Sequence, residues 1–165
     1  MKFLCDEMLK GVARWLRAAG YDTRVAPDGT QDSILLEQSR EQQRIFLTRD
    51  RRLVSQRPRR DDIVLLTCNQ EDDCLEELRI RLGVDWLYRP FSRCLKCNTP
   101  LLEAPAERWQ EIPQQSRELA TRLLYCPSCD QLFWDGGHVS RMRARLEQAN
   151  RADVSPHRPG TYPLQ

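Results

Sequence analysis

The 165-residue sequence lacks any long hydrophobic run, and no stretch approaches the roughly 20 apolar residues that a membrane-spanning helix needs. The first apolar stretch, residues 2–5, is too short for a signal peptide and is followed at once by Asp6 and Glu7. Hydrophobic residues still make up 40% of the chain, enough to build a core, and charged residues make up 30%. We therefore expect a cytoplasmic protein that does not enter a membrane.

Lysine is scarce, because the sequence has 3 lysines against 23 arginines. The formal net charge of +2 excludes a uniformly cationic protein. Arginine suits bidentate phosphate contacts, although a GC-rich genome would also favour its codons. Six arginines fall within twelve residues and could follow a nucleic-acid backbone or form a solvated loop; they are Arg49, Arg51, Arg52, Arg57, Arg59 and Arg60.

Four of the seven cysteines fall into two CxxC pairs. The pairs are Cys94 with Cys97 and Cys126 with Cys129, and the 28 residues between them leave room for a helix at residues 114–121. Each pair can bring two thiolates to one tetrahedral ion from a tight turn, so the pattern predicts a structural Zn²⁺ centre of the zinc-ribbon type. A thioredoxin-like redox pair fits less well, because that motif belongs to a βαβ unit.

The other three cysteines have no such spacing. In a reducing compartment we expect no disulfides, and we interpret Cys5, Cys68 and Cys74 as small buried hydrophobic residues.

Short apolar segments alternate with helical segments along the first half of the sequence. The predicted strands are residues 2–5, 21–26, 44–48, 63–66 and 84–88, and the predicted helices are residues 8–19, 32–43, 49–53 and 71–82. This alternation predicts a doubly wound parallel α/β sheet with right-handed crossovers.

The composition changes near residue 90, which predicts a division of the chain. Residues 1–90 are expected to form the α/β domain, and residues 91–150 the zinc ribbon with a C-terminal helix at residues 138–149. Residues 151–165 are rich in proline and are expected to form a disordered tail.

Three acidic residues stand where a parallel sheet binds its ligands. Asp6 follows the first predicted strand, Asp50 follows the third, and Asp32 opens a predicted helix. Ligands of such sheets bind beyond the carboxyl ends of the strands, so these carboxylates converge if the strands are neighbours. Converging carboxylates favour Mg²⁺ or Mn²⁺, which can activate water and stabilise a phosphate under attack. Each aspartate could instead cap a helix, and Glu7 and Asp28 are further candidates.

Several runs of the sequence match the pattern of one family. They are residues 3–9 (FLCDEML), 13–22 (ARWLRAAGYD) and 47–51 (LTRDR), with Asp32, the two CxxC pairs and residues 133–138 (FWDGGH). In these features the chain resembles the Mut7-C family over about residues 1–150. That family is described as a PIN-like ribonuclease fold fused to a C-terminal zinc ribbon.

The resemblance implies a PIN-like, metal-dependent ribonuclease that acts on RNA. Asp6, Asp32 and Asp50 would be its metal-binding acids, and the candidate phosphate contacts would be Arg14, Arg17 and Arg49. PIN-type sites often have a fourth acid shortly after the position of Asp50, where this chain has Arg51 and Arg52.

Other functions remain open. The chain could be a non-catalytic RNA-binding adaptor, in which the ribbon and the arginines bind RNA and the acids are caps. A phosphoacceptor receiver domain has similar acids but needs a lysine after the fifth strand, where this sequence reads Leu87-Tyr88-Arg89. We expect Trp15 to pack at the flank of its helix and the last helix to offer its arginines to RNA. The oligomeric state stays open, with a homodimer as one option.

Overall fold

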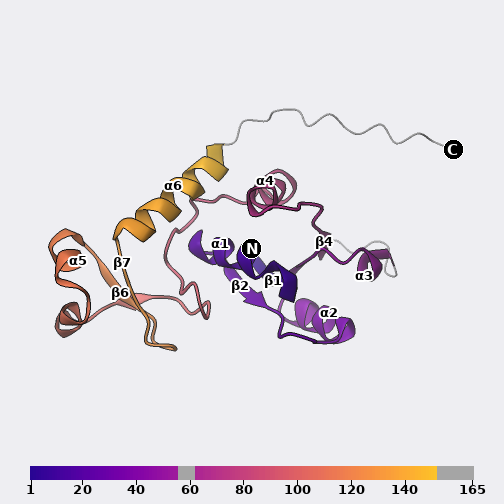
Figure 1. Ribbon diagram of the computed structural model, residues 1–165. Helices are drawn as coiled ribbons and strands as arrows, with labels where there is room; N and C mark the ends of the chain where they lie inside the picture. The colour runs from indigo at the N-terminus through magenta and orange to yellow at the C-terminus, as the bar shows by residue number, and fades with distance from the viewer. Residues whose placement is uncertain (56–61, 152–165) are drawn as a thin grey trace.

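The computed structural model describes residues 1–55 and 62–151, which form a parallel and an antiparallel β-sheet joined by helices (Figure 1). The predicted tail lies outside the described residues from residue 152 onward, as do Arg57, Arg59 and Arg60 of the arginine cluster. None of the helices in the described part of the chain has the length and apolar character of a membrane span.

The parallel sheet has four strands, which confirms the first four predicted strands. In sheet order they are β2 (Asp22–Val25), β1 (Lys2–Cys5), β3 (Ile45–Thr48) and β4 (Ile63–Leu65). Each neighbouring pair is parallel. Strands β1 and β3 are adjacent, with Cys5 opposite Leu47, so their carboxyl ends lie side by side. The predicted carboxylate site depends on this adjacency.

The predicted fifth strand at residues 84–88 is wrong. Among the described residues the parallel sheet ends at β4. The segment is apolar because Trp86 is fully buried against the helices, not because the segment joins the sheet. Its N–H groups find side-chain acceptors, since Asp85 N–H donates to the Tyr21 hydroxyl and Trp86 N–H donates to Asn150 Oδ1. The backbone is satisfied without strand pairing.

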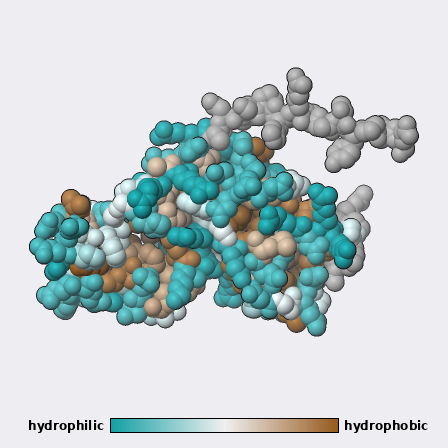
Figure 2. Space-filling view, in the orientation of Figure 1, coloured by the Kyte–Doolittle hydropathy of each residue, from teal (hydrophilic) through white to brown (hydrophobic). Residues whose placement is uncertain are grey.

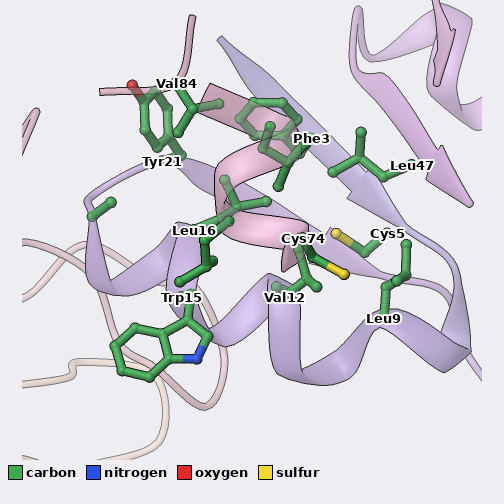
Figure 3. Packing of buried hydrophobic residues seen from close by; sticks show 14 of the residues in the cluster. Phe3, Cys5, Leu9, Val12, Trp15, Leu16, Tyr21, Leu47, Cys74 and Val84 are labelled. Carbon is green, nitrogen blue, oxygen red and sulfur yellow. The ribbon is translucent and has the colours of Figure 1, made fainter. Parts of the chain in front are cut away.

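Helices cover both faces of the parallel sheet. They are α1 (Lys10–Ala18), α2 (Asp32–Glu41), α3 (Arg51–Ser55) and α4 (Glu71–Leu82), with a short 3₁₀ helix η1 (Glu7–Leu9) before α1. Alternate residues of β1 divide between the faces: Phe3 and Cys5 pack with α1 and α4, and Leu4 packs with α2 and α3. Figure 3 shows the first cluster, where Val12 and Leu16 of α1 point toward β1.

The end of α1 is tied to the segment that leads to the second sheet. Gly20 ends the helix with φ of +96°, a conformation that side chains disfavour. A Cβ on Gly20 would lie 2.3 Å from the carbonyl oxygen of Arg89, so the two backbones could not approach as closely with any other residue. Arg89 N–H donates to the carbonyl of Ala19, which fixes this junction.

The second sheet is antiparallel and contains the cysteine pairs. Its strands, in sheet order, are β5 (Leu102–Glu103), β6 (Leu123–Tyr125) and β7 (Leu132–Trp134). Two helices fill the long spacer between the pairs, η2 (Ala106–Glu111) and α5 (Gln114–Leu119). The predicted helix in the spacer is therefore confirmed.

The last helix, α6 (Gly137–Arg151), returns from the second sheet to the helices of the first (Figure 1). Its residues Met142 and Leu146 are buried in the same cluster as α1 and α4. The guanidinium of Arg145 lies 4.6 Å from the ring centroid of Trp15 and donates to Asp72. Trp15 is 8% exposed, so its predicted packing role is confirmed.

The interpretation of Cys68 and Cys74 as free thiols is wrong, because the two form a disulfide. Both are buried as expected. Cys68 follows β4 and Cys74 lies in the first turns of α4, so the turn between them brings their Cα atoms to 5.0 Å. Cys5 is a free buried cysteine, as predicted, and burial raises the pKa of its thiol to about 12.

Candidate functional site

The four predicted zinc ligands come together at one point. Their sulfur atoms all lie within 4.8 Å of one another, and three of the sulfur pairs are 3.3–3.7 Å apart: Cys97 with Cys126, Cys94 with Cys129, and Cys97 with Cys129. A tetrahedral ion with Zn–S distances of about 2.3 Å requires sulfurs about 3.8 Å apart. The cluster therefore fits Zn²⁺ with four thiolate ligands.

The two cysteine pairs are held by the same local structure. Cys94 N–H donates to the carbonyl of Thr99 and Cys126 N–H to that of Gln131, five residues on in each case. In each turn the residue four positions after the first cysteine has positive φ, 72° at Asn98 and 56° at Asp130. Asparagine and aspartate tolerate this conformation better than most side chains. Two short, self-contained turns thus aim both pairs at a common centre.

The thiol groups of this cluster have opposite tendencies to ionise. Burial raises the pKa of Cys94 to about 12. Burial acts in the same direction on Cys97, but hydrogen bonds with Thr99 and with the thiols of Cys126 and Cys94 together outweigh it and lower the pKa to about 6. Four thiolates packed this closely would repel one another unless a cation neutralised them, which again fits a bound metal ion.

Asp6 and Asp50 converge on one buried hydroxyl group. Thr48, the last residue of β3, donates from Oγ1 to Asp6 Oδ2 at 2.8 Å and accepts the Asp50 N–H at 2.9 Å. Asp6 Oδ1 also accepts the Glu7 N–H at 2.7 Å. Asp50 Oδ1 accepts the Arg52 N–H at 2.7 Å, so both aspartates also cap the helices that follow them. The predicted cap roles of Asp6 and Asp50 are therefore confirmed, whereas the cap role predicted for Asp32 is wrong, because Gln31 is the N-cap residue of α2.

Asp32 and Arg49 are the other two residues that were predicted at this edge of the sheet. Asp32 is the exposed first residue of α2, and Arg49 is half-buried between Thr48 and Asp50. Among the described residues, the four cysteines are the only group of three or more Cys, His, Asp or Glu side chains close enough to hold one ion. The structure thus brings Asp6 and Asp50 to a common partner but does not gather all three carboxylates around one point.

The loop after β2 is fastened to the start of the first helix. Glu7 Oε2 accepts the Gly29 N–H at 2.7 Å, and Lys10 Nζ lies 2.6 Å from Asp28 Oδ1. Glu7 and Asp28, the further acidic candidates, are thereby engaged in holding this loop.

The predicted phosphate contacts differ in their surroundings. Arg17 is half-buried and donates to the backbone carbonyls of Thr23, Leu95 and Lys96, so it joins α1 to the first cysteine turn. Burial lowers its pKa. Arg14 is exposed on α1, and its Nη2 lies 3.2 Å from Nε2 of His138. Arg14 therefore keeps a free face toward solvent, whereas Arg17 is committed to the protein.

Thr48 is the site residue that sequence reasoning missed. The available signal was its position two residues before Asp50, the spacing of a threonine that bonds a nearby backbone N–H. Its hydrogen bond to Asp6 crosses between strands, which the sequence alone does not reveal.

Of three comparisons with known proteins, one gives a match. A family model described as the Mut7-C RNAse domain matches residues 1–146. No curated protein and no solved structure is similar enough to this chain to count as a match.

Proposed function

Because the chain belongs to the Mut7-C RNase domain family, we propose that it is a metal-dependent, PIN-like ribonuclease that hydrolyses RNA at the edge formed by Asp6 and Asp50. The observation that supports this most is the link through Thr48 between two aspartates at the ends of adjacent strands, because its hydroxyl donates to the Asp6 carboxylate and accepts the backbone N–H of Asp50. A parallel sheet binds its ligands at this edge. The zinc ribbon is proposed to aid RNA binding.

The donor atoms at this edge suit Mg²⁺ or Mn²⁺. Asp6, Asp50 and Asp32 offer only oxygen ligands, which hard cations prefer. Magnesium is often bound through one or two carboxylates plus substrate phosphates, so Asp6 and Asp50 are sufficient and Asp32 would add a third ligand. Such an ion, when bound, lowers the pKa of a bound water and stabilises negative charge on a phosphate.

The residues around the carboxylates have distinct roles in this proposal. The Thr48 hydroxyl fixes the orientation of the Asp6 carboxylate, because it donates to one oxygen and is itself held by the Asp50 N–H. Asp50 Oδ1 caps α3, which leaves Oδ2 for a ligand. Arg49 and Arg14 are proposed to hold RNA phosphates and to reduce the repulsion between phosphate and carboxylate.

The test compares substitutions of the carboxylates at the edge of the parallel sheet with the substitution of a carboxylate far from that edge. Asp6→Asn and Asp50→Asn should each reduce Mn²⁺-dependent cleavage of a labelled RNA by at least about 100-fold, because even groups that only orient metal ligands cost 10–100-fold when removed. Glu41→Gln is the matched control, since Glu41 is an exposed carboxylate in the last turn of α2, at the far end of that helix from Asp32. Equal activity in all four proteins would contradict the assignment.

The runner-up is a non-catalytic RNA-binding adaptor. Its specific support is that Asp6 and Asp50 both cap helices, which would explain their presence without catalysis. Wild-type protein that binds RNA but cleaves none across a range of Mn²⁺ and Mg²⁺ concentrations would favour this alternative.

A further inference from the structure

A large hollow lies where the ribbon sheet, the start of α6 and the exposed side of α1 meet. Its volume is about 790 Å³, within the range of about 300–1,000 Å³ typical of ligand pockets. We call it the ribbon groove and define it by Arg14, Phe91, Lys96, Trp134, His138 and Arg143, all of which line it. Hydrophobic surface on the ribbon side is bordered by hydrophilic side chains (Figure 2). The groove therefore combines an apolar floor with a polar rim.

The charge of the ribbon groove is positive and unbalanced. Arg14, Lys96 and Arg143 are exposed, and none of them has a carboxylate within ion-pair distance among the described residues. Nearby arginines differ, since Arg145 of the same helix pairs with Asp72 at 2.7 Å and Arg122 pairs with Glu103 at 2.8 Å. Three cations without a carboxylate partner on one surface attract an anionic ligand.

One carboxylate, that of Asp135, also lines the groove, but it is engaged in hydrogen bonds with neighbouring backbone groups. It accepts the N–H groups of Thr121 and Arg122 at 2.9 and 3.1 Å. It therefore joins the turn between β7 and α6 to the residues before β6, and its single negative charge leaves the groove with a net positive charge.

Aromatic rings lie beside these cations. Phe91, Phe133 and Trp134 line the groove and are each partly exposed. Phe91 is already covered on one side, because the guanidinium of Arg143 lies 5.2 Å from its ring centroid. Trp134 packs against Gly136, where an added Cβ would lie 2.9 Å from Nε1, so the glycine leaves room for the ring. Partly exposed aromatic rings next to cations that have no carboxylate partner are features with which proteins bind single-stranded nucleic acids.

We propose that the ribbon groove binds an unpaired segment of the RNA substrate, with phosphates at Arg14, Lys96 and Arg143 and a base stacked on Trp134 or Phe133. The inference rests on the proposed function for its choice of RNA over another anion. Helix α1 begins four residues after Asp6 and carries Arg14 on its exposed side, so it connects the groove to the acidic edge. The groove would thus select a single-stranded region next to the bond that is cleaved.

The first measurement is the affinity for a labelled unstructured RNA without Mg²⁺ or Mn²⁺, so that binding is separated from cleavage. Arg14→Ala and Arg143→Ala should each weaken binding severalfold and should each reduce the slope of log K against log salt by about 0.7, the value for one lost phosphate contact on a single strand. Arg40→Ala is the matched control, because Arg40 is exposed in the last turn of α2, away from the groove. Equal losses in all three variants, or in none, would overturn the proposal.

The second measurement tests stacking. Trp134→Leu keeps an apolar side chain on β7 but removes the ring face, and we expect roughly a tenfold loss of affinity. The zinc content of this variant, measured by native mass spectrometry, shows whether the ribbon is intact; Phe133→Leu provides a second ring variant should Trp134→Leu lose zinc. A blunt RNA duplex should bind more weakly than the single strand. Unchanged affinity in both ring variants, or equal binding of duplex and single strand, would contradict base stacking.

These outcomes differ from those that test catalysis. If groove variants bind and cleave RNA like the wild type, the groove has another occupant, such as a protein, and this inference fails while the nuclease assignment stands. If the groove variants lose binding but no metal supports cleavage, the groove assignment stands and the nuclease assignment fails.

Discussion

The four cysteines and the three aspartates were both predicted as metal ligands, and the structure arranges them differently. The thiols gather within 4.8 Å from two short turns, each complete within about six residues. The aspartates follow β1, follow β3 and open α2, and Asp6 and Asp50 are linked through Thr48 by the Asp6 carboxylate and the Asp50 backbone N–H. The difference suits the roles proposed for them, because a structural ion needs a closed shell of ligands whereas an ion that meets a substrate needs open coordination positions.

Removal of zinc should cause the largest loss of stability, and that loss should be confined to the region that contains the four cysteines. We expect Cys126→Ser to lose Zn²⁺ and unfold the ribbon, since structural zinc contributes on the order of 10 kcal/mol to folding. Hydrogen exchange should show unprotected amides in β5–β7 and protected amides in β1–β4. Cys5→Ala is the control that removes a thiol outside the cluster. Loss of protection in both sheets would show that the parallel sheet depends on the metal.

Substitution at Gly20 should break the junction between the two regions. Gly20→Ala should lower the free energy of unfolding by about 3 kcal/mol, because it adds strain at positive φ to a clash with the Arg89 carbonyl. Gly29→Ala is the control, since Gly29 also has positive φ but has nothing within 4 Å of the added Cβ. Urea unfolding measures both. Equal losses would mean that the contact with Arg89 adds nothing.

Thr48→Val should lower the proposed nuclease activity and leave the cysteine cluster unaffected. Without the hydroxyl the Asp6 carboxylate loses its orienting donor, and we expect a 10- to 100-fold loss of metal-dependent cleavage, about 1.4–2.7 kcal/mol. Thr23→Val is the matched control, because Thr23 is also a fully buried threonine and its hydroxyl donates a hydrogen bond to the Tyr21 carbonyl. Similar stability with unequal activity is the expected result. An equal loss of activity in both variants would show that Thr48 contributes only to packing and does not orient the Asp6 carboxylate.

Asp22 gives the smallest expected effect and makes the junction pH-dependent. Partial burial opposes ionisation of Asp22, but hydrogen bonds from Arg44 and from Asn98 of the first cysteine turn lower its pKa to about 2. Because the folded pKa lies below the unfolded value, this stabilisation is present above about pH 4 and is lost as the pH falls toward 2. After allowance for solvent screening we expect about 1 kcal/mol.

The measurement for Asp22 is urea unfolding at several pH values between 7 and 2. Asp22→Asn should be less stable at neutral pH and should show a flatter dependence on acid than the wild type. Asp28→Asn, which removes only the exposed pair with Lys10, should stay within about 0.5 kcal/mol at every pH. A wild-type curve that parallels that of Asp22→Asn would contradict the linkage.

Features that depend on neighbouring residues in the sequence were predicted correctly more often than features that depend on contacts between distant segments. The cysteine pairs, the first four strands and the helices follow from spacings of a few residues, and all are present. The segment at residues 84–88 has the apolar composition of a strand, but Trp86 is buried under helices that come from other parts of the chain. An apolar composition indicates that a segment is buried, but it does not show which part of the chain packs against that segment.

The same limit applies to the functional residues. The disulfide of Cys68 and Cys74 depends on how β4 turns into α4, and the link from Thr48 to Asp6 depends on the neighbour that β3 acquires. The ribbon groove draws Arg14, Phe91 and Trp134 from three separate segments. No periodicity joins such residues, so only the folded arrangement reveals them.

The return of α6 to the parallel sheet has a consequence for folding during synthesis. The apolar faces of α1 and α4 are completed by Met142 and Leu146, which leave the ribosome about 60 residues after α4 ends at Leu82. Until then those faces lack their final cover, and the ribbon is made in the interval. The two cysteine pairs are therefore synthesised before the residues that close the main core, and a chain cut short within α6 would expose apolar surface that favours aggregation.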